Sequence, residues 1–145
     1  MNNKFNTYIY TIIVAVVIST SFSACSKDTP AAQVDLSYKM LSDKTWFLDY
    51  VETINGGIIK TRSYLGQSTY FINFLNDKTT LDSDGAKGTY SIEVANGKIL
   101  IKVNAKSIGG NVITYEYKVE SMGAKVLVMS NDNNGTTNKF YYSAK

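Results

Sequence analysis

The chain has 145 residues and a formal net charge of +3 at pH 7, with its basic residues spread along its length. Because nucleic-acid-binding proteins gather basic residues into patches, this distribution argues against a nucleic-acid partner. Histidine is absent, which excludes histidine general bases, histidine-containing triads and histidine-ligated zinc sites. The length and composition of the chain predict a single globular domain.

The first 24 residues have the composition of a targeting peptide. Lys4 precedes an apolar run from Ile9 to Ile18, which is shorter than the roughly 20 residues that span a bilayer. Phe22-Ser23-Ala24-Cys25 follows, and Cys25 is the only cysteine of the chain. This order of an apolar residue, two small residues and a cysteine resembles the lipobox of bacterial lipoproteins. The resemblance implies a signal peptide at residues 1–24, cleavage before Cys25 and a diacylglycerol on its sulfur.

Residues 25–34 are predicted to be the acylated cysteine and a linker, because they are small, polar and without periodicity. Acyl chains on Cys25 would hold the mature protein on a membrane. Ser26 after the cysteine, in place of aspartate, resembles Gram-negative lipoproteins sorted to the outer membrane. We therefore expect an outer-membrane lipoprotein of the bacterial cell envelope, and the side that it faces stays open.

A short helix and a series of strands are predicted for residues 35–145. Asp35 to Asp43 predicts the helix, with Leu36, Met40 and Leu41 on one side. Alternating apolar residues predict strands at 44–53, 58–64, 69–75, 79–82, 88–95, 98–105, 112–120, 125–130 and 136–143. Short connections such as Asn96-Gly97 favour antiparallel neighbours. The expected fold is all-β, an eight- or nine-stranded up-and-down meander that closes into a barrel and so hides its apolar face and its edges.

The same region resembles the lipocalin-like domains of small bacterial lipoproteins. The similarity lies in the helical lead-in ending at Met40-Leu41, Trp46 early in the first strand, and two strand motifs, Tyr70-Phe71-Ile72-Asn73-Phe74 and Gly88-Thr89-Tyr90-Ser91-Ile92. The resemblance implies a lipocalin-like barrel or half-open calyx at residues 35–145. It also implies that the barrel could bind an apolar molecule and that there are no catalytic residues to carry over.

Tyrosines recur on the strand faces that the pattern places inside the barrel. Their rings and hydroxyls could line a ligand cavity. Because small barrels are usually filled by side chains, packing of the interior is the simpler interpretation. The residues concerned are Tyr50, Tyr70, Tyr90, Tyr115 and Tyr117.

Lys60 and Arg62 lie two residues apart, so they share one face of the second predicted strand. An outward orientation, in solvent or near anionic lipid head groups, is the simpler interpretation. An inward orientation would suit a carboxylate or phosphate head group.

Metal and catalytic sites are not predicted. Oxygen atoms are supplied by Asp77, Asp82, Asp84, Asp132 and Asn134, but the spacing of these residues fails the calcium-loop pattern, and aspartate and asparagine are ordinary turn residues. No Ser-x-x-Lys, Gly-x-Ser-x-Gly or phosphate-loop motif occurs. We therefore expect no enzyme and no cofactor.

Two functional hypotheses follow. The first is a lipid-anchored, lipocalin-like barrel that binds a small apolar or amphipathic molecule without catalysis. The alternative is an accessory or interaction protein with a filled barrel, whose loops at Ser83–Lys87, Lys106–Asn111 and Asn131–Gly135 contact another envelope protein.

Overall fold

The computed structural model describes residues 29–106 and 110–145. Cys25 and the predicted signal peptide lie outside these residues, as do positions 107–109 of the predicted loop Lys106–Asn111. The described part begins with the helix α2 (Pro30–Leu41). None of its helices is long and apolar enough to cross a membrane. The strands are β1 (Lys44–Asn55), β2 (Ile58–Ser63), β3 (Phe71–Phe74), β4 (Thr79–Asp82), β5 (Lys87–Ala95), β6 (Lys98–Lys106), β7 (Val112–Met122), β8 (Val126–Asn133) and β9 (Thr136–Ala144).

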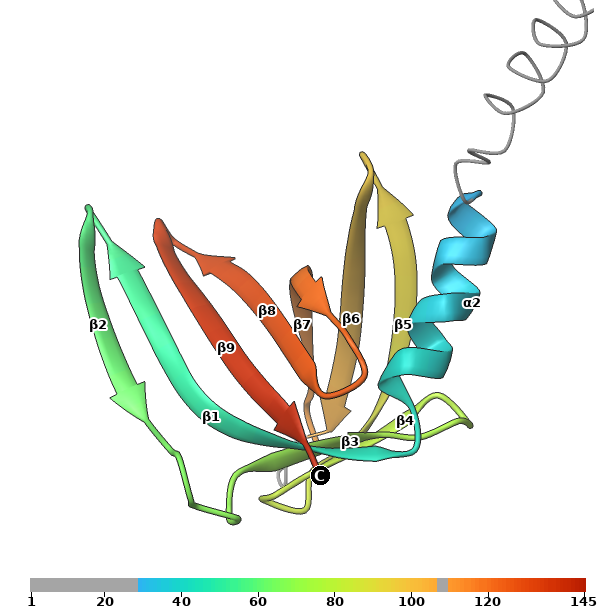
Figure 1. Ribbon diagram of the computed structural model, residues 1–145, viewed down its shortest axis with the longest axis horizontal. Helices are drawn as coiled ribbons and strands as arrows, with labels where there is room; N and C mark the ends of the chain where they lie inside the picture. The colour runs from blue at the N-terminus through green and yellow to red at the C-terminus, as the bar shows by residue number, and fades with distance from the viewer. Residues whose placement is uncertain (1–28, 107–109) are drawn as a thin grey trace, which may run out of the picture.

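Eight antiparallel strands close into a barrel, and β2 is an additional strand on the same sheet. The strand order is β2-β1-β3-β4-β5-β6-β7-β8-β9, and β9 pairs back with β1. Residues 44–47 of β1 pair with β3, whereas residues 50–55 pair with β2. The strand β2 therefore extends the sheet beyond the short β3 (Figure 1). The predicted antiparallel barrel is confirmed.

The interior of the barrel is packed with apolar side chains that alternate along the strands. Trp46, Phe74, Ile101 and Leu127 are fully buried, each from a different strand. Around them lie Leu41, Tyr90, Ile92, Val103 and Met129. Burial of this kind stabilises a fold by about 25 cal/mol per Å² of apolar surface removed from water.

The helix α2 begins earlier than the sequence predicts. The Thr29 side chain accepts a hydrogen bond from the Ala32 N–H, and Pro30 occupies the first turn. A threonine cap followed by proline starts helices well, because proline lacks the N–H that would be unpaired there. The expectation that residues 30–34 belong to a structureless linker is therefore wrong.

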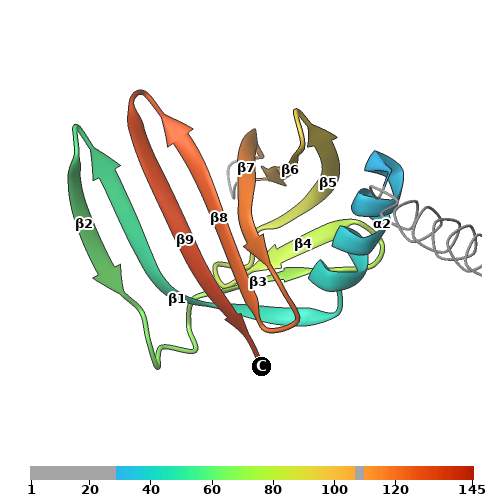
Figure 2. The ribbon, with the colours of Figure 1, turned by 45° about the horizontal axis from the view of Figure 1, so that its top comes forward.

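One end of the barrel, which we call the closed end, is covered by α2. The Trp46 indole N–H donates to the Leu41 carbonyl at 2.9 Å, and the Lys44 ammonium donates to the Met40 and Ala124 carbonyls at 2.8 and 3.1 Å. These bonds attach the helix end to the β7–β8 turn. Figure 2 shows α2 alongside the barrel next to β5.

The helix also covers a free strand edge. The strand β4 pairs with β5 only through Lys87, Gly88 and Thr89. Beyond that point the Ile92 N–H donates to the Tyr38 hydroxyl of α2 at 3.1 Å. Because the helix supplies this partner, the edge of β5 does not stay unpaired at the closed end.

The opposite end, which we call the open end, lies at the β1–β2 and β8–β9 turns. There β7 and β8 diverge, because β7 pairs with β8 only from Lys118 to Met122. The strands β3 and β4 have only four residues each. The strands β2, β1, β9 and β8 therefore rise as one wall, which we call the tall wall (Figure 1).

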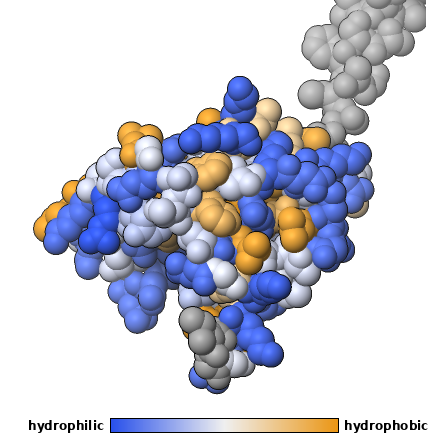
Figure 3. All heavy atoms as spheres, turned by 90° about the horizontal axis from the view of Figure 1, so that it is seen from below, coloured by the Kyte–Doolittle hydropathy of each residue, from blue (hydrophilic) through white to orange (hydrophobic). Residues whose placement is uncertain are grey.

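The outer surface is mixed in character. On the face that Figure 3 shows, small apolar patches lie among polar side chains. On the outer face of β5, β6 and β7, Lys102 pairs with Glu93 at 2.8 Å and with Glu116 at 3.6 Å. Such exposed pairs contribute little to stability but keep the surface polar.

Candidate ligand-binding site

The inner face of the tall wall carries the main hollow of the open end. Val51 of β1 lies opposite Arg62 of β2 on one side and Phe140 of β9 on the other. Side chains of directly opposed residues lie on the same face of a sheet. The Phe140 ring contacts the Tyr117 ring edge-to-face at 5.8 Å, and Tyr117 packs against the barrel core. Val51, Arg62 and Phe140 therefore lie on the face that continues into the barrel interior.

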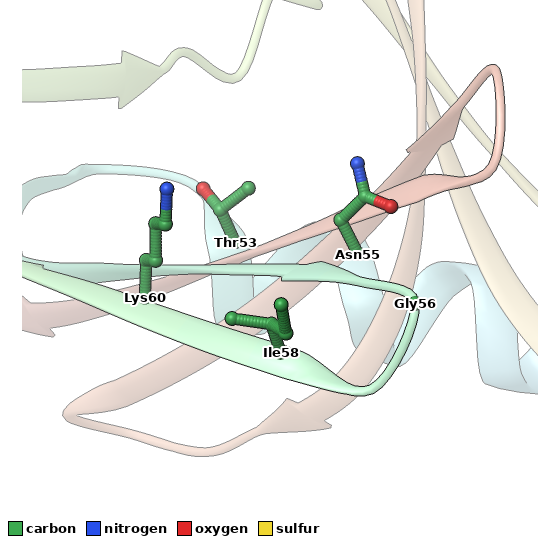
Figure 4. Close-up of a pocket in the computed structure, with 5 residues that line it drawn as sticks. All are labelled: Thr53, Asn55, Gly56, Ile58 and Lys60. Carbon is green, nitrogen blue, oxygen red and sulfur yellow. The ribbon is translucent and has the colours of Figure 1, made fainter.

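Two adjoining hollows follow this face. One has a volume of about 540 Å³ and is bounded by β1, β2 and β9, with Val51, Arg62 and Phe140 among its lining residues. The other, of about 420 Å³, lies nearer the β1–β2 turn. Both are lined by Thr53 and Lys60, so they form one groove. Figure 4 shows Thr53, Asn55, Ile58 and Lys60 pointing to the same side of the hairpin.

Lys60 and Arg62 lie on this inner face, so the interpretation that placed them on the outer face is wrong. The reason is the hairpin register, which sets Lys60 opposite Thr53 and Arg62 opposite Val51. Neither cation takes part in an ion pair within the described residues. A side-chain hydrogen bond with Tyr64 raises the pKa of Arg62. Both side chains are exposed at the groove.

Neutral polar groups beside the two cations are paired with one another. The Thr53 hydroxyl donates to the Asn138 side-chain carbonyl at 3.0 Å, and the Asn138 amide donates to Asn131 at 3.3 Å. Nearer the turn, Asn55 donates to the Thr136 hydroxyl at 3.2 Å. These bonds cross from β1 to β9 and β8, so they hold the tall wall in register.

The carboxylates of the tall wall lie on its outer face. Glu52 accepts a hydrogen bond from the Tyr141 hydroxyl at 2.8 Å, and Asp49 accepts one from Ser143 at 3.0 Å. The bond to Glu52 raises the pKa of Tyr141 to about 12. The sheet therefore separates the acidic outer side of this wall from its basic inner side.

Tyr50 does not face the interior, contrary to the alternation that the sequence suggests. The register between β1 and β9 shifts by one residue between Leu48 and Tyr50. Such a bulge turns the following side chains to the opposite face. Tyr50 consequently stacks on Tyr141 at 4.1 Å, on the outer side, and Val51 takes the inner position instead.

The other four predicted tyrosines divide between core and open end. Tyr90 is buried, and its hydroxyl donates to the Leu75 carbonyl at 3.0 Å, so it fills the closed end. Tyr117 is partly buried, and burial raises its pKa to about 12. Tyr115 stacks on it at 6.2 Å and is 39% exposed. Tyr70 lies just before β3, where its ring contacts Tyr64 at 4.7 Å.

The residues Val51, Thr53, Phe140 and Asn138 line or support the groove, and sequence reasoning missed them. Only the bulge in β1 places Val51 inside, and no feature of the local sequence marks that bulge. Phe140 and Asn138 do alternate within their predicted strand, which was a usable signal for a shared face.

A second hollow lies at the closed end, between α2 and the strands β6 and β7. Its volume is about 290 Å³, and Leu36, Met40, Ile99 and Val119 are among its lining residues. It is mainly apolar and carries no basic side chain. A third hollow, of about 420 Å³, lies between β7 and the β8–β9 turn, with Tyr115, Glu116 and Asp132 among its lining residues. Of these hollows in the described part of the chain, the groove is the one lined by basic side chains.

The described residues provide no group of three or more metal-ligating side chains close enough to hold a metal ion. Asp82, on the inner face of β4, accepts hydrogen bonds from the Asp84 and Ala86 N–H groups at 3.0 and 2.9 Å. Its carboxylate thus orders the β4–β5 turn.

Fold and site define a small antiparallel barrel with one helix-covered end and one grooved, basic end. Comparisons with protein-family models, with curated proteins and with solved structures give no match.

Proposed function

We propose that this chain is a lipid-anchored lipoprotein of the bacterial outer membrane whose barrel binds a small amphipathic molecule at its open end, without catalysis. The observation that carries the proposal is the difference between the two ends of the barrel. The closed end is filled by Trp46, Phe74 and Leu41, which are fully buried. The open end carries the groove, whose larger hollow has a volume of about 540 Å³.

The lining of the groove supports an amphipathic rather than a purely apolar ligand. Val51 and Phe140 offer apolar surface, whereas Lys60 and Arg62 offer charge, all on one face. Ligand sites of this kind combine an apolar wall with a few convergent polar groups. A purely apolar molecule would leave the two cations without an ionic partner among the described residues.

The anchor is a separate part of the proposal and has its own experiment. Cells expressing the full-length chain are labelled with an alkyne-bearing fatty acid and then fractionated. We expect label and membrane association in the wild type and the loss of both in Cys25→Ala, because the sulfur carries the lipid. Cys25→Ala protein that stays labelled and membrane-bound would overturn the lipoprotein assignment.

The ligand is tested by native mass spectrometry of the full-length protein released from detergent. We expect an adduct of lipid-like mass, and we expect Thr53→Trp to reduce it, because an indole at position 53 fills the groove that Thr53 lines. Thr89→Trp is the matched control, since Thr89 is exposed on the outer side of β5. Wild-type protein without any adduct, and without a thermal shift on addition of amphiphiles, would contradict the proposal.

A second candidate function, an accessory protein that binds another envelope protein, is favoured by one feature of β7. Residues 112–117 pair with β6 but not with β8, so one strand edge is unpaired there. Val112 and Ile113 on this segment are 65% and 44% exposed. Exposed apolar strand edges are templates for pairing with another chain.

This candidate is tested by photo-crosslinking in intact cells. A photoreactive residue at position 112 should give one discrete protein adduct if the free edge of β7 binds a partner. The same residue at position 98, which is exposed at the closed end, is the control. Equal, diffuse labelling from both positions would count against a partner at β7.

A further inference from the structure

The charges of the tall wall are arranged for an anion. Lys60 and Arg62 stand two residues apart on β2, about 6.6 Å along the strand. That spacing allows one carboxylate or phosphate group to contact both side chains. Since arginine offers a planar fork of donors and lysine a mobile ammonium, the pair suits an anion with several oxygen atoms.

No carboxylate on this wall competes for the two cations. Asp49 and Glu52 are held on the outer face by Ser143 and Tyr141. Asp82 belongs to the opposite side of the barrel and is bonded to backbone N–H groups. The neutral neighbours Thr53 and Asn138 are paired with each other. An anion at Lys60 and Arg62 would therefore supply an ion pair that neither side chain makes within the described residues.

The apolar part of the groove begins beside this pair. Phe140 lies opposite Val51, which in turn lies opposite Arg62. The Phe140 ring leads on to Tyr117, whose ring contacts it at 5.8 Å, and Tyr117 to Tyr115 at 6.2 Å. The polar and apolar portions are thus arranged in sequence, from the β2 edge towards the interior.

We infer that the ligand of the open end is an anionic amphiphile, with a carboxylate or phosphate head group on Lys60 and Arg62 and an apolar chain against Phe140 and Tyr117. This inference rests on the proposed function, because it names the chemical class of the molecule that the groove binds. The same head-group chemistry occurs in lipids and in free inorganic or small organic anions. The row of rings from Phe140 through Tyr117 to Tyr115 favours a ligand that has an apolar chain.

The test is equilibrium dialysis with full-length protein held in phosphatidylcholine nanodiscs, corrected with empty nanodiscs. The probes are octyl phosphate, octanoate, octanol and inorganic phosphate. Hydrogen bonds between charged groups are roughly twice as strong as neutral ones, so we expect octyl phosphate and octanoate to bind at least about tenfold tighter than octanol. We expect inorganic phosphate to bind more weakly than octyl phosphate, because it lacks the chain.

The double variant Lys60→Gln/Arg62→Gln should bind octyl phosphate no more tightly than octanol. The control is Lys98→Gln/Lys125→Gln, which removes the same charge from two exposed positions at the closed end. We expect the control to keep the preference of the wild type. Preservation of the preference in Lys60→Gln/Arg62→Gln would overturn the inference.

The remaining outcomes separate this inference from the proposed function. Equal binding of octanol and octyl phosphate to the wild type would overturn the anionic head group but leave an amphiphile site in place. Inorganic phosphate that binds as tightly as octyl phosphate would show that the apolar chain of the ligand contributes nothing, and would point to a free anion as ligand. Absence of binding by all four probes would overturn the proposed function itself.

Discussion

Gly88 occupies a point on β5 where the barrel has no room for a side chain. A Cβ atom there would lie 2.4 Å from the Asn104 carbonyl oxygen and 2.9 Å from the Thr80 hydroxyl oxygen. The threonine can rotate, but the Asn104 carbonyl belongs to the β5–β6 ladder, where Asn104 pairs with Thr89. Gly88→Ala must therefore displace backbone. Overpacking of this kind costs about 1–3 kcal/mol.

The matched control is Gly123→Ala, because the nearest atom to a Cβ at Gly123 is the Val126 carbonyl oxygen at 3.9 Å. Replacing glycine by alanine at an unstrained position stabilises by about 0.4–1 kcal/mol through the unfolded state. Urea unfolding can be followed by the fluorescence of Trp46, the only tryptophan. We expect Gly88→Ala to unfold at lower urea than the wild type and Gly123→Ala to unfold at the same or higher urea. Equal stability of the two variants would refute the close approach of β4, β5 and β6.

Three further predictions concern the closed end and the tyrosines. Tyr38→Phe should lower the free energy of unfolding by about 1–2 kcal/mol in urea titrations, because it leaves the Ile92 N–H without its partner. Trp46→Phe should cost more, about 2–4 kcal/mol by calorimetry, since it empties buried volume and removes the bond to the Leu41 carbonyl. The contribution of Tyr117 to stability should be constant below pH 10 and fall as the pH rises towards 12, because the pKa of Tyr117 is raised to about 12 whereas unfolded tyrosines ionise near 10. In urea titrations across this pH range, Tyr117→Phe should show a smaller fall, and an unchanged fall would contradict burial as its cause.

The strands could be predicted because their signals are local. Asn96-Gly97 marks a tight hairpin, and the alternation from Ile99 to Val103 matches the buried positions of β6. The closed barrel followed from many strands joined by short turns, since closure is the way to hide one apolar face and two edges. Neither signal depends on which residues meet across the barrel.

The composition of the site could not be predicted, because it depends on register between distant strands. One extra residue in β1, beside Leu48, moves Tyr50 outside and Val51 inside. The inner position of Lys60 and Arg62 follows from the pairing of β2 with the second half of β1. Period-2 alternation shows that Lys60 and Arg62 share a face, but only the pairing with β1 shows which face it is.

The start of α2 was missed for a different reason. The residues from Pro30 to Gln33 are small and polar, so they carry no apolar periodicity. The cap at Thr29 and the proline after it were nevertheless visible in the sequence. Weighing these two residues above composition would have placed the helix correctly.

Amide chemical shifts, mapped as octyl phosphate is added to the protein, would locate the ligand most directly. If the groove on the inner face of the tall wall is the binding site, the largest shift changes fall at Thr53, Lys60 and Arg62. Shift changes that centre on Leu36 and Met40 would instead place the ligand beneath α2, in the apolar hollow of the closed end, and would contradict binding in the groove.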